Sequence, residues 1–299
     1  LTNVTALAAS SISDLRTLAI SIGNSEFSNA TGLTTIAVSD STIDATALAE
    51  RIDSYDTING DNTTDMTLAS GATIEVDAGE ITAMLADETA GRLTIDDQKI
   101  TVNSAGTISV DTANLLAATT TGVITASITT TETVDELNTL TGTGNAYTIV
   151  IHSDDAVSST AAKLNTINDA TTVAVSLTNV TALAASSLND LGTLATAINN
   201  SEFSNAGGLT TIAVTDTTID ATTLAARIDS YDTINGGSAT TGMTLASGAT
   251  INVDSGEITA MLADETAGRL TIGDQAITVT GEITVDNANL LNATTSGAI

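Results

Sequence analysis

Hydrophobic and polar residues alternate over short stretches of this chain, and each such stretch is followed by a polar turn. The alternation is clearest in TIEVD from Thr73 and TINVD from Thr250, where Ile and Val occupy one face. An Ala- and Leu-rich stretch follows, preceded by Thr, Asp or Ser, the residue types that cap helix N-termini. A loop rich in Thr, Asn and Gly then ends the pattern. It recurs at residues 34–52, 107–123, 128–144 and 154–175.

This pattern predicts short strands joined by short helical turns. One such unit cannot bury its apolar face alone, whereas stacked neighbours can bury it between them. We therefore predict a mainly β protein, a parallel β-solenoid with short helical turns at the corners. The alternative is a tandem array of small β or α/β domains, because the intervals of roughly 20 to 35 residues are irregular for a short-repeat β-helix.

A much longer repeat covers the whole sequence. Residues 1–60 align with residues 177–236 without a gap, and the two segments differ at only 11 positions. The match continues with two small length changes in polar loops, which gives a period of about 176 residues. We predict a first full period at residues 1–176 and a second, truncated period at residues 177–299. Because both ends fall in mid-pattern, we expect a piece of a longer tandem array.

The composition limits how the core can be built. Apolar residues make up 42% of the chain but aromatic residues only 2%, so the core must consist of Ala, Val, Ile and Leu in thin, closely stacked layers. There is no Trp and no Pro, which disfavours immunoglobulin-like sandwiches. The 59 Thr residues are β-branched and favour extended backbone.

The charge balance excludes several kinds of partner. With 36 acidic and 7 basic residues the net charge is −29, so nucleic acids and anionic membrane surfaces would be repelled. No apolar run approaches the roughly 18 residues of a membrane span, so we expect no direct membrane insertion. Such strong self-repulsion is best tolerated in salt or with bound divalent cations, which are candidate partners.

The stretch from Thr160 to Val175, together with TVDELNTLTGTG, resembles the Thr-, Ala- and Asp-rich repeats of giant cell-surface proteins, particularly those of marine cyanobacteria. The resemblance extends over essentially the whole chain and is one of pattern and composition. It implies an extracellular or cell-surface location. It also implies a structural, adhesive or motility-related role.

The sequence offers little material for catalysis. Its single His, His152, ends an apolar strand, where a structural role is the simplest interpretation, and any Ser–His–acid triad would have to use it. The TGTGNA stretch at residues 141–146 lacks the third Gly of a dinucleotide-binding loop. We therefore predict that the protein is not an enzyme.

The acidic residues suggest one candidate metal site. We predict that the segment DSYDTINGDN is one loop, which supplies carboxylate and amide oxygens of the kind that Ca²⁺ prefers, so calcium is the candidate cofactor. The spacing is not that of an EF-hand, and the second copy has Gly237 in place of Asp61. The alternative is an Asp-rich turn capped by its own side chains. The candidate ligands are Asp53, Asp56 and Asn59 in the first copy and Asp229, Asp232 and Asn235 in the second.

Two of the few basic positions are retained in both copies. These are Arg51 with Arg227, and Arg92 with Arg269, whereas Arg16 becomes Gly192 and Lys99 becomes Ala276. We predict that the retained arginines anchor nearby carboxylates or carbonyls between layers.

Near-identical tandem copies without reactive clusters favour a structural function. We predict a fibre, sheath or surface-layer component whose partners are further copies of itself, both end to end and side by side. One alternative is the extender region of a giant adhesin with its binding module elsewhere. A second is an ice- or polysaccharide-binding surface, with cell-surface glycans as partners, although regularly spaced TxT pairs are missing.

Overall fold

The structure is a computed structural model of the chain, and it describes all residues except 2, 61–63, 152–158, 179 and 238–240. The described residues form two compact units. Unit 1 comprises Leu1–Thr129 and Leu140–Thr148, and unit 2 comprises Thr130–Thr139 and Ile149–Ile299. The predicted periods at 1–176 and 177–299 are defined by sequence similarity rather than by compactness, and they stay predictions.

Unit 1 consists of two parallel sheets and the helices that follow their strands. The first sheet has the order β1-β2-β4-β6, and the second has the order β10-β9-β7-β5-β3 with β8 also paired to β9. Its strands are β1 (Ala6–Ser10), β2 (Thr35–Val38), β3 (Thr42–Asp44), β4 (Asp65–Leu68), β5 (Thr73–Val76), β6 (Leu93–Thr94), β7 (Lys99–Val102), β8 (Thr107–Ile108), β9 (Ile124–Ile128) and β10 (Ala146–Thr148). Its helices are α1 (Ile12–Gly23), α2 (Ala45–Asn59), α3 (Ile81–Thr89) and α4 (Val110–Thr119).

Unit 2 repeats this arrangement with strand orders β12-β14-β16-β18 and β15-β17-β19, and adds the pair β11-β13. Its strands are β11 (Val175–Ser176), β12 (Ala182–Ser186), β13 (Phe203–Ser204), β14 (Thr211–Val214), β15 (Thr218–Asp220), β16 (Gly242–Thr244), β17 (Thr250–Asp254), β18 (Leu270–Thr271) and β19 (Ala276–Thr280). Its helices are α5 (Val134–Leu137), α6 (Ala161–Asp169), α7 (Leu188–Asn199), α8 (Ala221–Ile234), α9 (Ile258–Thr266) and α10 (Val285–Thr294).

The core of each unit is a set of apolar ladders that run from strand to strand. Parallel pairing in register places identical or similar side chains side by side, and these are buried beneath the helices. In unit 1 one ladder consists of Ile36, Met66 and Leu93, and another of Ile43, Ile74, Ile100 and Ile124. In unit 2 the matching ladders are Ile212, Met243 and Leu270, and Ile219, Ile251 and Ile277.

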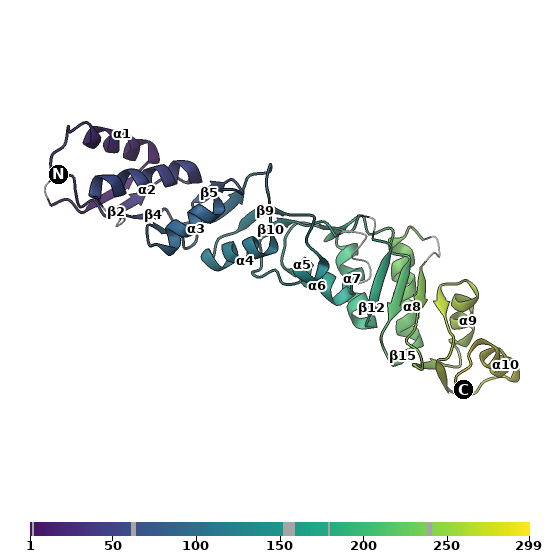
Figure 1. Cartoon of the computed structure of the whole chain (residues 1–299). Coiled ribbons are helices and arrows are strands. Elements are labelled where there is room, and N and C mark those ends of the chain that lie inside the picture. The colour runs from purple at the N-terminus through teal and green to yellow at the C-terminus, as the bar shows by residue number, and fades with distance from the viewer. Residues whose placement is uncertain (2, 61–63, 152–158, 179, 238–240) are drawn as a thin grey trace. The chain divides into compact units, whose positions relative to one another are not determined.

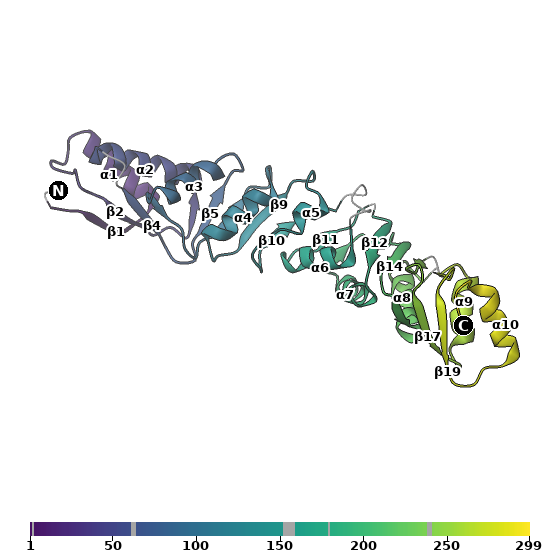
Figure 2. The ribbon, with the colours of Figure 1, turned by 60° about the horizontal axis from the view of Figure 1, so that its bottom comes forward.

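The helices begin where the sequence predicts caps. Asp44, Ser109, Thr133 and Thr160 have extended backbones, and each side chain accepts a hydrogen bond from an N–H in the first helical turn. Helix α2 buries Leu48, Ile52 and Tyr55 against the unit 1 core. Figures 1 and 2 show α1 and α2 side by side next to β2 and β4, and the two helices pack on each other.

The predicted mainly β solenoid is wrong. Helix makes up 37% of the structure and strand 25%, and the parallel sheets with their helices form a mixed α/β fold with no closed solenoid among the described residues. This fold is compatible with the alternative, an array of small α/β domains. The difference has a physical cause, because the preference of Thr for strand is weak and depends on its surroundings. Many Thr residues instead lie on exposed helix faces, where the hydroxyl of Thr57, for example, donates to the carbonyl four residues earlier.

No helix in the described residues has the combined length and hydrophobicity that crossing a bilayer requires.

Candidate functional site

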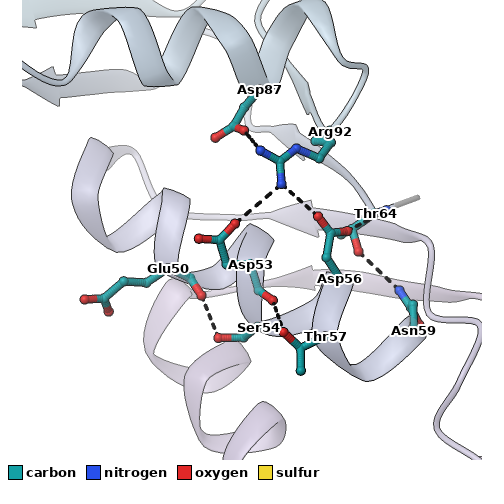
Figure 3. A network of polar contacts seen from close by, with 9 residues as sticks. All are labelled: Glu50, Asp53, Ser54, Asp56, Thr57, Asn59, Thr64, Asp87 and Arg92. Carbon is teal, nitrogen blue, oxygen red and sulfur yellow. Dashed lines mark hydrogen bonds and ion pairs between the residues drawn. The ribbon is translucent and has the colours of Figure 1, made fainter. Parts of the chain in front are cut away.

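The most connected polar site in unit 1 is centred on Arg92, which follows helix α3 after a tight turn. Helix α2 presents Asp53 and Asp56, three residues apart and therefore on one face, and helix α3 presents Asp87. All three carboxylates point toward the guanidinium (Figure 3). Two helices are thereby joined through one side chain.

The two terminal nitrogens of the guanidinium contact all three carboxylates. Its Nη1 lies 2.9 Å from Asp56 Oδ2 and 3.4 Å from Asp53 Oδ1, and its Nη2 donates to Asp87 Oδ1. The side chains of Asp56 and Asp87 are 7% and 9% exposed, whereas that of Asp53 is 74% exposed. The two buried contacts therefore dominate, since an exposed ion pair contributes little.

Unit 2 contains the same cluster around Arg269. Its Nη1 lies 3.0 Å from Asp232 Oδ2 on α8 and 3.5 Å from Asp229 Oδ1, and its Nη2 donates to Asp264 on α9. The prediction that these retained arginines anchor carboxylates between layers is confirmed for Arg92 and Arg269.

The end of helix α2 is fixed to neighbouring loops by the same group of residues. Asp56 Oδ1 accepts from the buried backbone N–H of Thr64 at 3.1 Å. The side-chain amide of Asn59 donates to the Leu33 carbonyl at 2.9 Å and to Thr64 Oγ1 at 3.2 Å, as Figure 3 shows for Thr64. The amide of Asn59 also accepts from Gly32 N–H at 3.0 Å.

In unit 2 three of these four contacts recur, whereas the counterpart of the Gly32–Asn59 bond is missing and the buried Asn235 Oδ1 accepts no hydrogen bond among the described residues. Asp232 accepts from the N–H of Thr241 at 3.0 Å, and Asn235 donates to the Leu209 carbonyl at 2.8 Å and to Thr241 Oγ1 at 3.0 Å. The helix end and the cluster therefore form one polar assembly in each unit, in which Asp56 or Asp232 contacts both the guanidinium and the next segment of chain.

The electrostatics of the clusters follow from burial. Desolvation raises the pKa of Asp87, and the nearby Arg92 partly opposes this effect. The hydrogen bond to Asp56 raises the pKa of Arg92 further above its ordinary value. Asp264 and Arg269 show the same directions with the same causes. A guanidinium does not release its proton near neutral pH, so this arrangement is suited to holding helices together rather than to proton transfer.

The structure places the candidate calcium ligands differently from the prediction. Asp53, Asp56 and Asn59 lie on helix α2 rather than in a loop, and in unit 2 Asp229 and Asp232 lie on α8 with Asn235 at its C-terminal cap. The arginine lies between the carboxylates, and the asparagine amide faces a backbone carbonyl. Among the described residues, no group of three or more His, Cys, Asp or Glu is arranged to hold a metal ion. Calcium at this segment stays a prediction, and Asp61 and His152 lie outside the described residues.

The second retained arginine pair has different surroundings in the two units. Arg51 is buried and pairs with the exposed Glu50 at 3.1 Å. In unit 2 the position of Glu50 is Ala226, and the Arg227 guanidinium lies against Gly192, where an added Cβ would come within 2.6 Å of its Cζ. Gly192 replaces Arg16, so one cation and one anion have changed together.

Asp87 and Asp264 are not among the residues that the sequence predicts to be functional. The available signal was the segment DETAGR, which both copies retain and which places the aspartate five residues before the arginine. The sequence also did not predict a role for Tyr55 and Tyr231. Their buried hydroxyls donate to the carbonyls of Leu15 and Leu191, respectively.

Comparison with known proteins gives no relative. No protein-family model, no curated protein and no solved structure matches the chain. The resemblance to cyanobacterial cell-surface repeats therefore stays a prediction.

Proposed function

We propose that the chain is a structural repeat segment of an extracellular or cell-surface assembly, such as a fibre, a sheath or a surface layer. The observation that carries the proposal is what the two copies share. Both keep a guanidinium that joins two helices through buried carboxylates, and both keep the apolar ladders that hold successive parallel strands together. What has been retained is thus the set of contacts between consecutive strand and helix layers.

The positions that differ between the copies support the same proposal. Six of the 11 differences between residues 1–60 and 177–236 fall on helix α1 and its counterpart α7, and the buried Leu15 and Leu191 are unchanged there. At three of these six positions the α7 residue is buried (Leu188, Gly192 and Ala197), and the arginine clusters and the apolar ladders are retained nonetheless. This is the pattern expected of a segment that transmits load or covers a surface, in which internal stability is what matters.

Electron microscopy of the native material, located with an antibody against this chain, tests the proposal. Filaments or a sheet with an axial spacing set by the period of about 176 residues would support it. A discrete soluble particle that turns over a substrate would contradict it. Labelling confined to stalks that carry a terminal binding module would favour the adhesin extender instead.

A further inference from the structure

A cleft in unit 2 lies along helix α7, the element on which the two copies differ most. It has a volume of about 450 Å³ and is lined by eight residues, of which seven belong to α7 and the loop after it and one is Arg227 of α8. Four of the eight, Asn189, Gly192, Thr196 and Ala197, differ from their counterparts in unit 1, whereas only 11 of the 60 aligned positions differ in all. The divergence between the copies is therefore concentrated on this cleft.

Two of these exchanges remove bulk or add a polar group. Gly192 takes the place of Arg16, which leaves the helix without a side chain at this point. The Arg227 guanidinium lies directly against the helix there, since a Cβ added to Gly192 would come within 2.6 Å of its Cζ. Thr196 takes the place of Ile20 and puts a hydroxyl where unit 1 has an apolar side chain. The cleft is thus both open and polar beside the guanidinium.

The cation in this cleft has lost the anion that its counterpart keeps. Arg51 pairs with Glu50 in unit 1, but in unit 2 the position of Glu50 is Ala226. The guanidinium of Arg227 is partly buried, its Nε is fully buried, and it forms no ion pair or hydrogen bond with any described residue. A charge that is withdrawn from water is normally paired. Arg227 can therefore bind an acceptor from outside the chain.

Further polar groups continue from the guanidinium toward the end of α7. Asn200 lies about 12 Å beyond Gly192 along the helix axis, with Thr196 midway between them. The Thr196 hydroxyl donates to the Gly192 carbonyl at 2.9 Å, so its oxygen can still accept. The carboxylate of Glu202 is held by the side-chain amides of Asn168 at 2.7 Å and Asn200 at 3.3 Å. This end of the cleft suits ligand hydroxyls, and Glu202 would repel a second acid group.

We propose that the cleft binds a sugar acid, with the carboxylate on Arg227 and the hydroxyls toward Thr196, Asn200 and Glu202. A guanidinium presents its N–H groups in a planar fork that matches a carboxylate. The net charge of −29 and the single cation in the cleft disfavour a polyanion. The acid group is therefore isolated, either in a free sugar acid or in a saccharide whose neighbouring units are neutral. The proposal goes beyond the proposed function and does not depend on assembly.

Titration of the native chain with glucuronate tests the proposal, with the NMR signals of the Arg227 Nε–H and of the backbone amides of residues 192–202 as the readout. Salt at about 0.15 M limits the repulsion by distant acidic residues, because the screening length is then about 8 Å. We expect saturable shifts of these signals. Arg227→Ala should weaken binding at least about tenfold, because it removes charge-assisted hydrogen bonds to the carboxylate.

Unit 1 supplies a matched variant that keeps Arg227. Gly192→Arg combined with Ala226→Glu restores the two residues of unit 1, where the same combination stands in a folded α1–α2 pair. We expect this double variant to fold like the native chain and to bind glucuronate at least about tenfold more weakly. Arg16→Ala changes an exposed arginine outside the cleft and should leave the affinity unchanged.

Three further ligands define the chemistry. Glucose lacks the acid group and acetate lacks the hydroxyls, so each should bind at least about tenfold more weakly than glucuronate. A trisaccharide with glucuronate between two neutral sugars separates the two sources. Binding as tight as that of glucuronate assigns the cleft to a saccharide, and weaker binding assigns it to a free sugar acid.

The proposal is wrong if glucuronate causes no saturable shift, or if acetate or glucose binds as tightly as glucuronate. It is also wrong if the double variant or Arg227→Ala binds glucuronate like the native chain. These outcomes are distinguishable from failure of the proposed function, because microscopy of the native material detects fibres or sheets whether or not this cleft holds a ligand.

Discussion

The two retained arginine pairs of this protein differ in how much their surroundings have changed between the copies. Arg92 and Arg269 contact the same three carboxylates in each unit, with Nη1 to buried carboxylate distances of 2.9 and 3.0 Å. Arg51 and Arg227 have kept the arginine but not its surroundings, because the paired Glu50 has become Ala226 and Arg16 has become Gly192. Buried carboxylates require their guanidinium, whereas an exposed glutamate can be lost when a nearby arginine is lost with it.

The largest expected effect comes from removing the arginine of either cluster. Arg92→Ala or Arg269→Ala leaves two buried carboxylates without their cation, which should cost about 3 kcal/mol, the lower end for a broken buried pair because the arginine reaches solvent. Urea unfolding followed by circular dichroism measures the loss. Arg16→Ala, at an exposed position, is the control and should change stability by less than about 0.5 kcal/mol. Equal losses in the cluster and control variants would show that the buried carboxylates do not depend on their arginine for stability.

A second experiment asks whether calcium can replace the guanidinium. In Arg92→Ala, Asp53, Asp56 and Asp87 have no cation between them, and carboxylate oxygens are the ligands that calcium takes. Calcium at about ten times its dissociation constant should restore about 1.4 kcal/mol in this variant. The native chain should respond alike to calcium and to sodium at matched ionic strength. A calcium-specific rise in melting temperature of the native chain would instead support the calcium site predicted from the sequence.

The buried tyrosines should behave identically in the two units. Tyr55→Phe and Tyr231→Phe each remove a hydroxyl that donates to a helix carbonyl 40 residues away, at 3.0 and 3.1 Å. We expect a loss of about 1 kcal/mol in each case, since the ring still fills its place. Thermal unfolding of both variants measures it. A loss in one unit alone would show that α1–α2 and α7–α8 pack differently.

Gly192 provides a smaller test of the altered arginine environment. Replacing Gly by Ala within a helix normally stabilises the folded state by about 1 kcal/mol. At Gly192, however, the added Cβ meets the guanidinium of Arg227. Gly192→Ala should therefore stabilise the chain by about 1 kcal/mol in an Arg227→Ala background and by less in the native background. Urea unfolding of the four chains completes the cycle. Equal gains in both backgrounds would mean that Arg227 moves aside without cost.

The smallest expected effect concerns acid. Hydrogen bonds from the Ser70 hydroxyl and the Gly71 N–H hold the pKa of Asp97 below its ordinary value, and Ser247 and Gly248 do the same for Asp274. A depressed folded-state pKa stabilises the folded state above the unfolded pKa of about 4, and this contribution is lost as the pH falls through the folded pKa.

The paired variant Asp97→Asn with Asp274→Asn should therefore lose less stability than the native chain between about pH 4 and pH 2. Melting temperatures across that range measure the difference, with Glu26→Gln as an exposed control. Asp87 and Asp264 act in the opposite direction. Burial raises the pKa of both, so their contribution to stability is present below the unfolded pKa and is lost as the pH rises through the folded pKa. An unchanged acid limb in the paired variant would show that other carboxylates govern acid unfolding.

The sequence by itself determined the repeat, the helix starts and the alternation of the strands. Residues 1–60 and 177–236 share 49 of 60 positions, and the capping roles of Asp44, Thr133 and Thr160 follow from local hydrogen bonding that needs no tertiary context. It also indicated that Arg92 and Arg269 anchor carboxylates, because so few cations are present and these two are retained.

Only the tertiary structure decided how far the helices extend and which carboxylates meet. A β-branched residue such as Thr57 accepts a helical backbone when its hydroxyl can bond the preceding turn, and burial of Ile52 and Tyr55 outweighs its weak preference for strand. Asp56 and Asp87 lie 31 residues apart in the chain, and nothing local brings them together. They meet at Arg92 because parallel pairing of β3 with β5 and of β4 with β6 places α2 beside α3.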